Sequence, residues 1–169
     1  MKRKILLISI LVNLFSIQAY GTEQIPDLLI IEKDTFYLFY TFPIEDLNLE
    51  IKKNPFISGK YTIHSTACWR GYQAIWKIKN NKLYLQNVKS CHSDSIFHYN
   101  SVIEYFRVNG YEPNIENGKI LADWFTSDLI RYDGPYFVDC KICLMGSDKL
   151  MNNEKVYYSI INGEIKEND

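Results

Sequence analysis

The sequence has no excess of basic residues. Among its 169 residues, 19 lysine and arginine residues stand against 20 aspartate and glutamate residues, which gives a net charge of −1. Proteins that mainly bind nucleic acid carry a basic excess that neutralises phosphates, so the composition argues against that class. The charged fraction of 23% and the hydrophobic fraction of 47% are those of a globular domain, which excludes a wholly disordered chain and a polytopic membrane protein.

The sequence also lacks the short motifs that mark common enzyme classes. It contains no GxSxG, no GxGxxG, no phosphate-binding P-loop and no HExxH. We therefore expect no bound cofactor and no metal, and we favour a non-catalytic protein over an enzyme.

The apolar run from Ile5 to Ile17 is shorter than the roughly 20 residues that a membrane-spanning helix needs. It follows the basic residues Lys2–Lys4 and precedes the small residues Ala19 and Gly21. This order is typical of a secretory signal peptide. We predict that residues 1–21 are cleaved, and that residues 22–169 form a single β-rich domain without an integral membrane span. The expected location is periplasmic or secreted.

Aromatic residues make up 15% of the chain, with 13 tyrosines, 9 phenylalanines and 3 tryptophans. Aromatic side chains favour strands. We predict a mainly β (α+β) fold in which an antiparallel sheet forms a sandwich or a partial barrel. In one segment the apolar residues no longer alternate but recur every three or four residues. This spacing predicts one main helix near residues 94–108. Further hairpin turns are expected at Glu32–Asp34 and Asn162-Gly163, and a single helical turn near residues 44–49.

The segment Trp69–Val88 predicts the best-defined hairpin. Asn80-Asn81 suits a two-residue turn, because asparagine tolerates a positive φ. With that turn, the residue numbers of facing positions sum to 161. The register then pairs apolar side chains on one face, Ile78 with Leu83 and Trp76 with Leu85.

Four cysteines follow the predicted signal peptide, which suggests two intramolecular disulfides in an exported protein. Extending the hairpin register leaves Cys68 and Cys91 two residues out of alignment, close enough for a bridge if a bulge intervenes. Cys140 and Cys143 form a CxxC, but its flanks look like strand rather than the helix start of a redox site. A zinc site of the four cysteines with His92 has suitable ligand types. Disulfides are preferred, and three pairings stay open.

The densest candidate for recognition is Trp69-Arg70-Gly71-Tyr72, because arginine and aromatic residues are enriched at binding hot spots. Asp123 and Trp124 add a second acidic and aromatic pair. These residues predict an exported binding or interaction protein, whose partner is an unknown protein or glycan in the cell envelope or outside. The alternative is an envelope hydrolase acting on glycans or peptides, with Asp123, Asp139 or His64 as acid or base.

Two segments also carry a resemblance to a family. Residues 68–85 and the later segment Ala122–Thr126 resemble a family of uncharacterised bacterial exported proteins. Its members carry a similar W-R-G-Y-x-A-x-W-x-I-K-x-x-x-L-Y-L hairpin and then A-D-W-F-[ST]. The resemblance implies a small β-rich protein and implies no activity or catalytic residues.

Overall fold

The computed structural model describes residues 22–49, 55–56, 66–91, 95–131, 143–146 and 156–166. The predicted signal peptide lies outside these residues. In chain order, the elements are β1 Asp27–Ile31, β2 Asp34–Phe39, η1 Glu45–Leu47, η3 Thr66–Cys68, β3 Tyr72–Lys79, β4 Lys82–Ser90, α2 Tyr99–Val108, β5 Ile115–Glu116, β6 Lys119–Leu121, β7 Ser127–Arg131, β8 Cys143–Gly146, β9 Val156–Ile161 and β10 Glu164–Lys166. The short helix η1 falls in the predicted helical turn.

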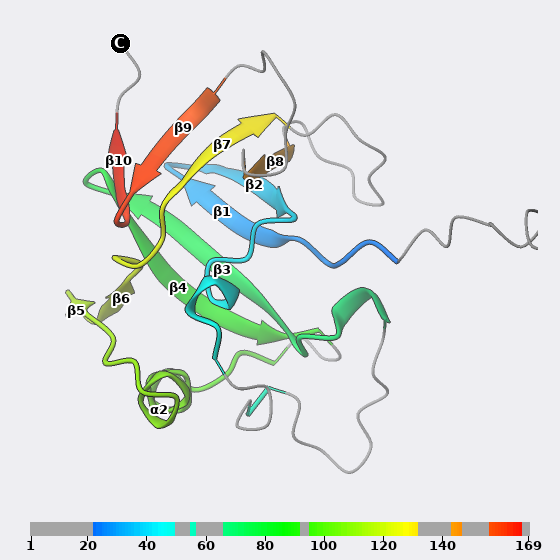
Figure 1. Ribbon diagram of the computed structural model, residues 1–169, viewed down its shortest axis with the longest axis vertical. Coiled ribbons are helices and arrows are strands. Elements are labelled where there is room, and N and C mark those ends of the chain that lie inside the picture. The colour runs from blue at the N-terminus through cyan, green and yellow to red at the C-terminus, as the bar shows by residue number, and fades with distance from the viewer. Residues whose placement is uncertain are drawn as a thin grey trace, which may run out of the picture.

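The described strands form one sheet that closes on itself (Figure 1). Their order is β10-β9-β7-β8-β2-β1-β3-β4-β6-β5, and β10 also pairs with β4 through Glu164 and Lys82. The strands from β10 to β4 in this order therefore make a closed barrel of eight, and β6 and β5 pair beyond it. The mainly β prediction is confirmed, but the sandwich or partial barrel is corrected to a closed barrel.

The predicted antiparallel sheet also needs correction, because the sheet is mixed. Strand β1 pairs with β3 in parallel, and β2 pairs with β8 in parallel. The β1–β2 hairpin thus lies between β3, the next strand of the chain, and β8, a much later one. Apolar alternation reports which face of a strand is buried and carries no information on its neighbour, so the sequence prediction did not include these pairs.

The β3–β4 hairpin follows the predicted register at its turn. Ile78 pairs with Leu83 and Trp76 with Leu85, and both turn asparagines have positive φ angles. A bulge between Ile75 and Trp76 then shifts the register by one residue. This shift does not itself align Cys68 with Cys91. Instead the chain turns before β3, where the Gly71 amide donates to the Cys68 carbonyl and the Cys91 amide donates to the Gly71 carbonyl, and this turn accompanies the Cys68–Cys91 bridge.

The predicted turn at Asn162-Gly163 joins β9 to β10, with φ angles of 51° and 75°. Gly163 is constrained twice. Its φ lies in the left-handed region, and a Cβ atom there would come within 2.6 Å of the Ala122 carbonyl oxygen. The turn therefore packs directly against the segment that connects β6 with β7.

The main helix, α2, is shorter than predicted. It begins at Tyr99, and Ser95 to Phe97 instead extend the pairing with β4. The Phe97 amide donates to the Val88 carbonyl, and Ile96 forms a bridge with Lys89. Edge pairing with β4 therefore replaces the first turns of the expected helix. The buried face of α2 closes the lower end of the barrel in Figure 1, through Val102, Ile103, Tyr105 and Phe106.

The predicted alternation from Lys119 to Tyr132 is interrupted at residues 122–126, between β6 and β7. Here the Trp124 indole nitrogen donates to the Pro43 carbonyl at 2.6 Å, and its ring lies edge-on to Trp76 at 6.4 Å. The tertiary contacts of Trp124 thus turn the chain out of the strand.

Cys68 and Cys91 form a disulfide, and Cys143 is also disulfide-bonded. Cys140 lies outside the described residues. The Cys68–Cys91 bridge confirms one disulfide and removes two of the ligands in the zinc hypothesis. No helix in the described ranges is long and apolar enough to cross a membrane.

The Cys68–Cys91 bridge closes a loop with a sequence separation of 23 residues. Replacing both cysteines with serine should lower the free energy of unfolding by about 2–4 kcal/mol, because the unfolded chain regains the entropy of the open loop. Urea denaturation followed by far-UV circular dichroism measures this loss. An unchanged urea midpoint would contradict it.

Candidate functional site

The predicted recognition residues surround a buried ion pair at the start of β3. The Arg70 side chain is 1% exposed, and its Nη1 donates to Asp27 Oδ1 at 2.9 Å. Its Nη2 donates to the Ile25 carbonyl at 2.6 Å, and its Nε lies 3.4 Å from a carboxylate oxygen of Glu45. Two of the three guanidinium nitrogens thus donate hydrogen bonds, and the third lies within ion-pair distance of Glu45.

Asp27 accepts further hydrogen bonds from the hairpin that carries Arg70. The Ala74 amide donates to its Oδ1 and the Trp76 indole to its Oδ2, each at 3.1 Å. Both carboxylate oxygens are therefore satisfied, although the residue is fully buried. Asp27 ties β1 to β3 at the end of the barrel that α2 covers.

Aromatic rings enclose the guanidinium on its faces. The Cζ atom of Arg70 lies 3.8 Å from the centre of the Phe42 ring and 5.0 Å from that of Tyr72. Burial acts to lower the pKa of Arg70, but the charge of Asp27, the Tyr72 hydroxyl, the hydrogen bond to Asp27 and the charge of Glu45 together raise it. Arg70 therefore stays protonated and is fixed as part of the wall.

An open cavity of 280 Å³ lies beside this ion pair and has Trp69 at its edge. We call it the Trp69 pocket. Its lining comes from η1, the start of β3 and α2, and consists of Ile44, Glu45, Asn48, Leu49, Trp69, Arg70, Tyr72 and Tyr105. The Trp69 side chain is 44% exposed, which is unusual for so large a ring, so it offers an apolar surface to a ligand.

Two buried tyrosines, Tyr72 and Tyr105, also line the Trp69 pocket. Tyr72 and Tyr105 are 3% and 5% exposed, and within the described part of the chain no group hydrogen-bonds to either hydroxyl. Burial raises the pKa of both tyrosines above the ordinary value. Both hydroxyls therefore stay protonated at neutral pH and can each donate and accept a hydrogen bond.

The structure brings together three of the five predicted binding residues: Trp69, Arg70 and Tyr72 line one pocket. Only Trp69 is exposed, and Arg70 supports the wall. Their role in binding stays a prediction.

Asp123 and Trp124 do not line the Trp69 pocket. Asp123 accepts hydrogen bonds from the Tyr111 hydroxyl at 2.5 Å and from the Asn114 amide at 3.1 Å. Trp124 is half-buried against Phe106 and Tyr111. Burial, followed by the hydrogen bond to Asp123 and its charge, raises the pKa of Tyr111. These contacts give Asp123 and Trp124 a part in packing the loop that follows α2.

The other candidate acids, bases and ligands cannot be placed. His64, His92 and Asp139 lie outside the described residues. Within the ranges that are described, no three histidine, cysteine, aspartate or glutamate side chains are grouped as a metal site would need.

The sequence analysis missed Asp27, Glu45 and Tyr105. Asp27 could have been recognised from the sequence, because it begins an apolar strand and lies on the same face of that strand as Leu29 and Ile31. A charged residue on a buried face needs a buried partner. Tyr105 gave no such signal, since its position on α2 fits an ordinary core residue.

Comparison of the chain with protein-family models, with curated proteins and with solved structures finds no match. The family resemblance of the hairpin motif therefore stays a prediction.

Proposed function

We propose that the protein is an exported, non-catalytic binding protein, and that its ligand occupies the Trp69 pocket. The observation that carries the proposal is the half-exposed Trp69 ring at a pocket that two buried tyrosines, Tyr72 and Tyr105, also line. A flat apolar ring with nearby neutral donors and acceptors suits a ligand that is itself part apolar and part hydroxylated. The uncharged rings of glycans have that character, so a neutral glycan unit is the ligand we favour.

The fixed state of Arg70 supports this choice of ligand. A binding site for anions normally presents an arginine whose donors point to the ligand. Here the Arg70 nitrogens are directed to Asp27, Glu45 and the Ile25 carbonyl. The Arg70 guanidinium thus supports the wall of the Trp69 pocket, which includes Tyr72.

The alternative function, a hydrolase that uses Asp123, has less support. Both oxygens of the Asp123 carboxylate already accept hydrogen bonds from Tyr111 and Asn114. A general acid needs to reach the leaving group of its substrate. The Cys68–Cys91 disulfide also fits export into an oxidising compartment, which agrees with the N-terminal signal pattern.

Replacing Trp69 with alanine tests the proposed site. The unmodified protein should bind a neutral oligosaccharide from a panel, with a saturable change in tryptophan fluorescence. Trp69→Ala should weaken binding roughly 30-fold, the effect of losing a hot-spot side chain worth about 2 kcal/mol. Isothermal titration calorimetry checks the affinity, because it needs no tryptophan signal.

Ile161→Ala is the matched control, since Ile161 is 45% exposed and lies on β9 outside the pocket. It should leave binding unchanged. The proposal is wrong if no neutral oligosaccharide binds, or if Trp69→Ala binds as well as the unmodified protein.

A further inference from the structure

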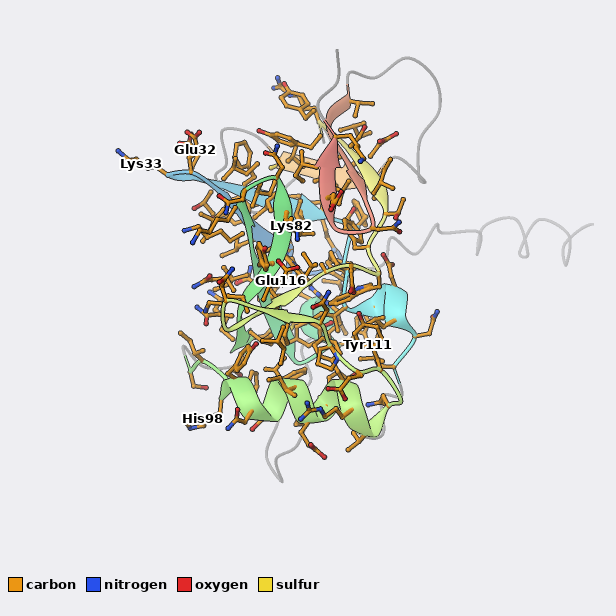
Figure 2. All side chains as sticks on the ribbon, turned by 90° about the vertical axis from the view of Figure 1, so that its left-hand side faces the viewer. Glu32, Lys33, Lys82, His98, Tyr111 and Glu116 are labelled. Atoms are coloured by element: carbon orange, nitrogen blue, oxygen red, sulfur yellow. A yellow bond between two sulfur atoms is a disulfide. The ribbon has the colours of Figure 1, made fainter. Side chains whose placement is uncertain are left out.

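The end of the barrel opposite α2 carries a second cavity. We call this end the mouth. It is formed by the β1–β2 turn at Glu32–Lys33, the β3–β4 turn at Asn80-Asn81, the start of β9 and the end of β10. Figure 2 shows Glu32 and Lys33 at the end of the molecule remote from α2, beside which His98 is labelled. Tyr72 begins β3 and Ile78 lies near its other end, so the Trp69 pocket and the mouth are at opposite ends of one strand.

The cavity in the mouth has a volume of 620 Å³, within the range of about 300–1,000 Å³ that is typical of small-molecule sites. Its walls are apolar and aromatic, and they include Ile31, Ile78, Ile165, Tyr157 and Tyr158. Polar side chains of the two turns and Lys166 lie at the rim.

These wall residues point into the barrel. Ile31 pairs with Ile78 on the face that also carries Leu29 and Trp76. Ile165 pairs with Ile160, which is buried in the same core. Yet Ile31, Ile78 and Ile165 are only partly buried, whereas Leu29 and Trp76 are fully buried. The inward apolar face therefore continues into the mouth, and the described protein groups do not cover it there.

An eight-stranded barrel is just wide enough either to be filled by its own side chains or to hold one small ligand. This barrel combines the two arrangements. Trp76, Leu29 and Leu85 fill the half next to α2. The half next to the mouth carries the open cavity, whose volume suits a small molecule better than a peptide or a protein surface.

The wall includes two tyrosines, Tyr157 and Tyr158, whose side chains carry hydroxyl groups. The Tyr158 hydroxyl makes no hydrogen bond to any residue that the structure describes. Burial, and then the charges of Glu32 and Asp34, raise the pKa of Tyr158, so the hydroxyl remains a donor at neutral pH. A ligand that fills the cavity and carries one acceptor would satisfy it.

We propose that the mouth binds a small, uncharged amphipathic molecule, with its apolar body on Ile31, Ile78 and Ile165 and an acceptor group on the Tyr158 hydroxyl. This site is separate from the Trp69 pocket and does not depend on the function proposed for it.

Binding of the neutral dye N-phenyl-1-naphthylamine tests the mouth. The unmodified protein should enhance the fluorescence of the dye with saturation at one dye per chain. Ile165→Lys should weaken this binding at least about tenfold, because it places a charge in the apolar wall. Ile161→Lys is the matched control, since Ile161 lies on the same hairpin and is 45% exposed on the outer face. It should bind the dye as the unmodified protein does.

Two further variants keep the test decisive. If Ile165→Lys does not fold, Ile165→Trp fills the cavity without a charge and should also weaken dye binding. Trp69→Ala should leave dye binding unchanged, which separates this proposal from the glycan site. The proposal is overturned if the unmodified protein does not bind the dye, if a folded Ile165 variant binds it normally, or if Trp69→Ala abolishes binding.

Discussion

Replacing Arg70 with alanine is expected to lower the free energy of unfolding by about 3–5 kcal/mol, as much as the loss of a large core side chain. The Arg70 guanidinium is the buried cation beside Asp27, and both side chains are almost completely removed from solvent. Without Arg70, the Asp27 carboxylate would remain buried as a charge whose cation is gone. Urea denaturation followed by far-UV circular dichroism measures the change.

Arg107 provides a matched control for Arg70. It also pairs with a carboxylate, that of Glu112 at 2.7 Å, but both side chains are exposed. Arg107→Ala should therefore cost at most about 1 kcal/mol, as surface ion pairs do. An equal, small loss for the two arginine variants would contradict the buried ion pair.

A double variant distinguishes the effect of leaving a buried charge unpaired from the effect of losing the volume of the arginine side chain. Asp27→Asn with Arg70→Met removes both charges, and the asparagine oxygen can still accept from the Ala74 amide and the Trp76 indole. It should be more stable than Arg70→Ala alone, because no isolated charge stays buried. If the double variant is less stable than Arg70→Ala, the charge of Asp27 is not the cause of the loss.

Replacing Trp76 with alanine is expected to cost about 3–5 kcal/mol, through lost burial and an unfilled cavity. Trp76 is fully buried between β1 and β4, where it pairs with Leu29 and Leu85. The same change removes the indole donor from Asp27. Domains have only about 5–15 kcal/mol of stability, so this variant should unfold at a much lower urea concentration or fail to fold.

Trp69→Ala is the control for Trp76→Ala, because it removes the same side chain from an exposed position. It should change the free energy of unfolding by about 0.5 kcal/mol or less. Equal stabilities of the two tryptophan variants would contradict the contrast between a buried Trp76 and an exposed Trp69.

The features that the sequence predicted correctly depend on residues close together in the chain. The turn residues of the β3–β4 hairpin and the alternation on each side of them determine its register, and the structure has that register at Trp76 and Ile78. The β9–β10 turn at Asn162-Gly163 is similar, because the dipeptide itself supplies two positive φ angles.

The features that it did not predict depend on residues far apart. Pairing between β2 and β8, or between β10 and β4, leaves no periodic signal within either strand. The start of α2 was also misplaced, although the competing pair is close in the chain, since Ile96 pairs with Lys89 of β4 instead of continuing the helix. Local propensity gave way in each case to tertiary pairing.

The candidate site was partly predictable. Trp69, Arg70 and Tyr72 could be selected because they are adjacent in the sequence and suited to recognition. The sequence could not show that Trp69 is exposed while Arg70 and Tyr72 are buried. This difference depends on Asp27 and Tyr105, which belong to other elements of the fold.

The closure of the barrel has a consequence for the order in which the chain acquires its structure. Tyr37 of β2 pairs with Cys143 of β8, and Lys82 of β4 pairs with Glu164 of β10. Such distant pairings bring loop-closure costs before they contribute stability, and they make folding slow. Because the chain is synthesised from its N-terminus, β2 and the outer edge of β4 lack these partners until β8 and β10 have been made. The barrel is therefore completed only after the C-terminal strands β8 and β10 have been made.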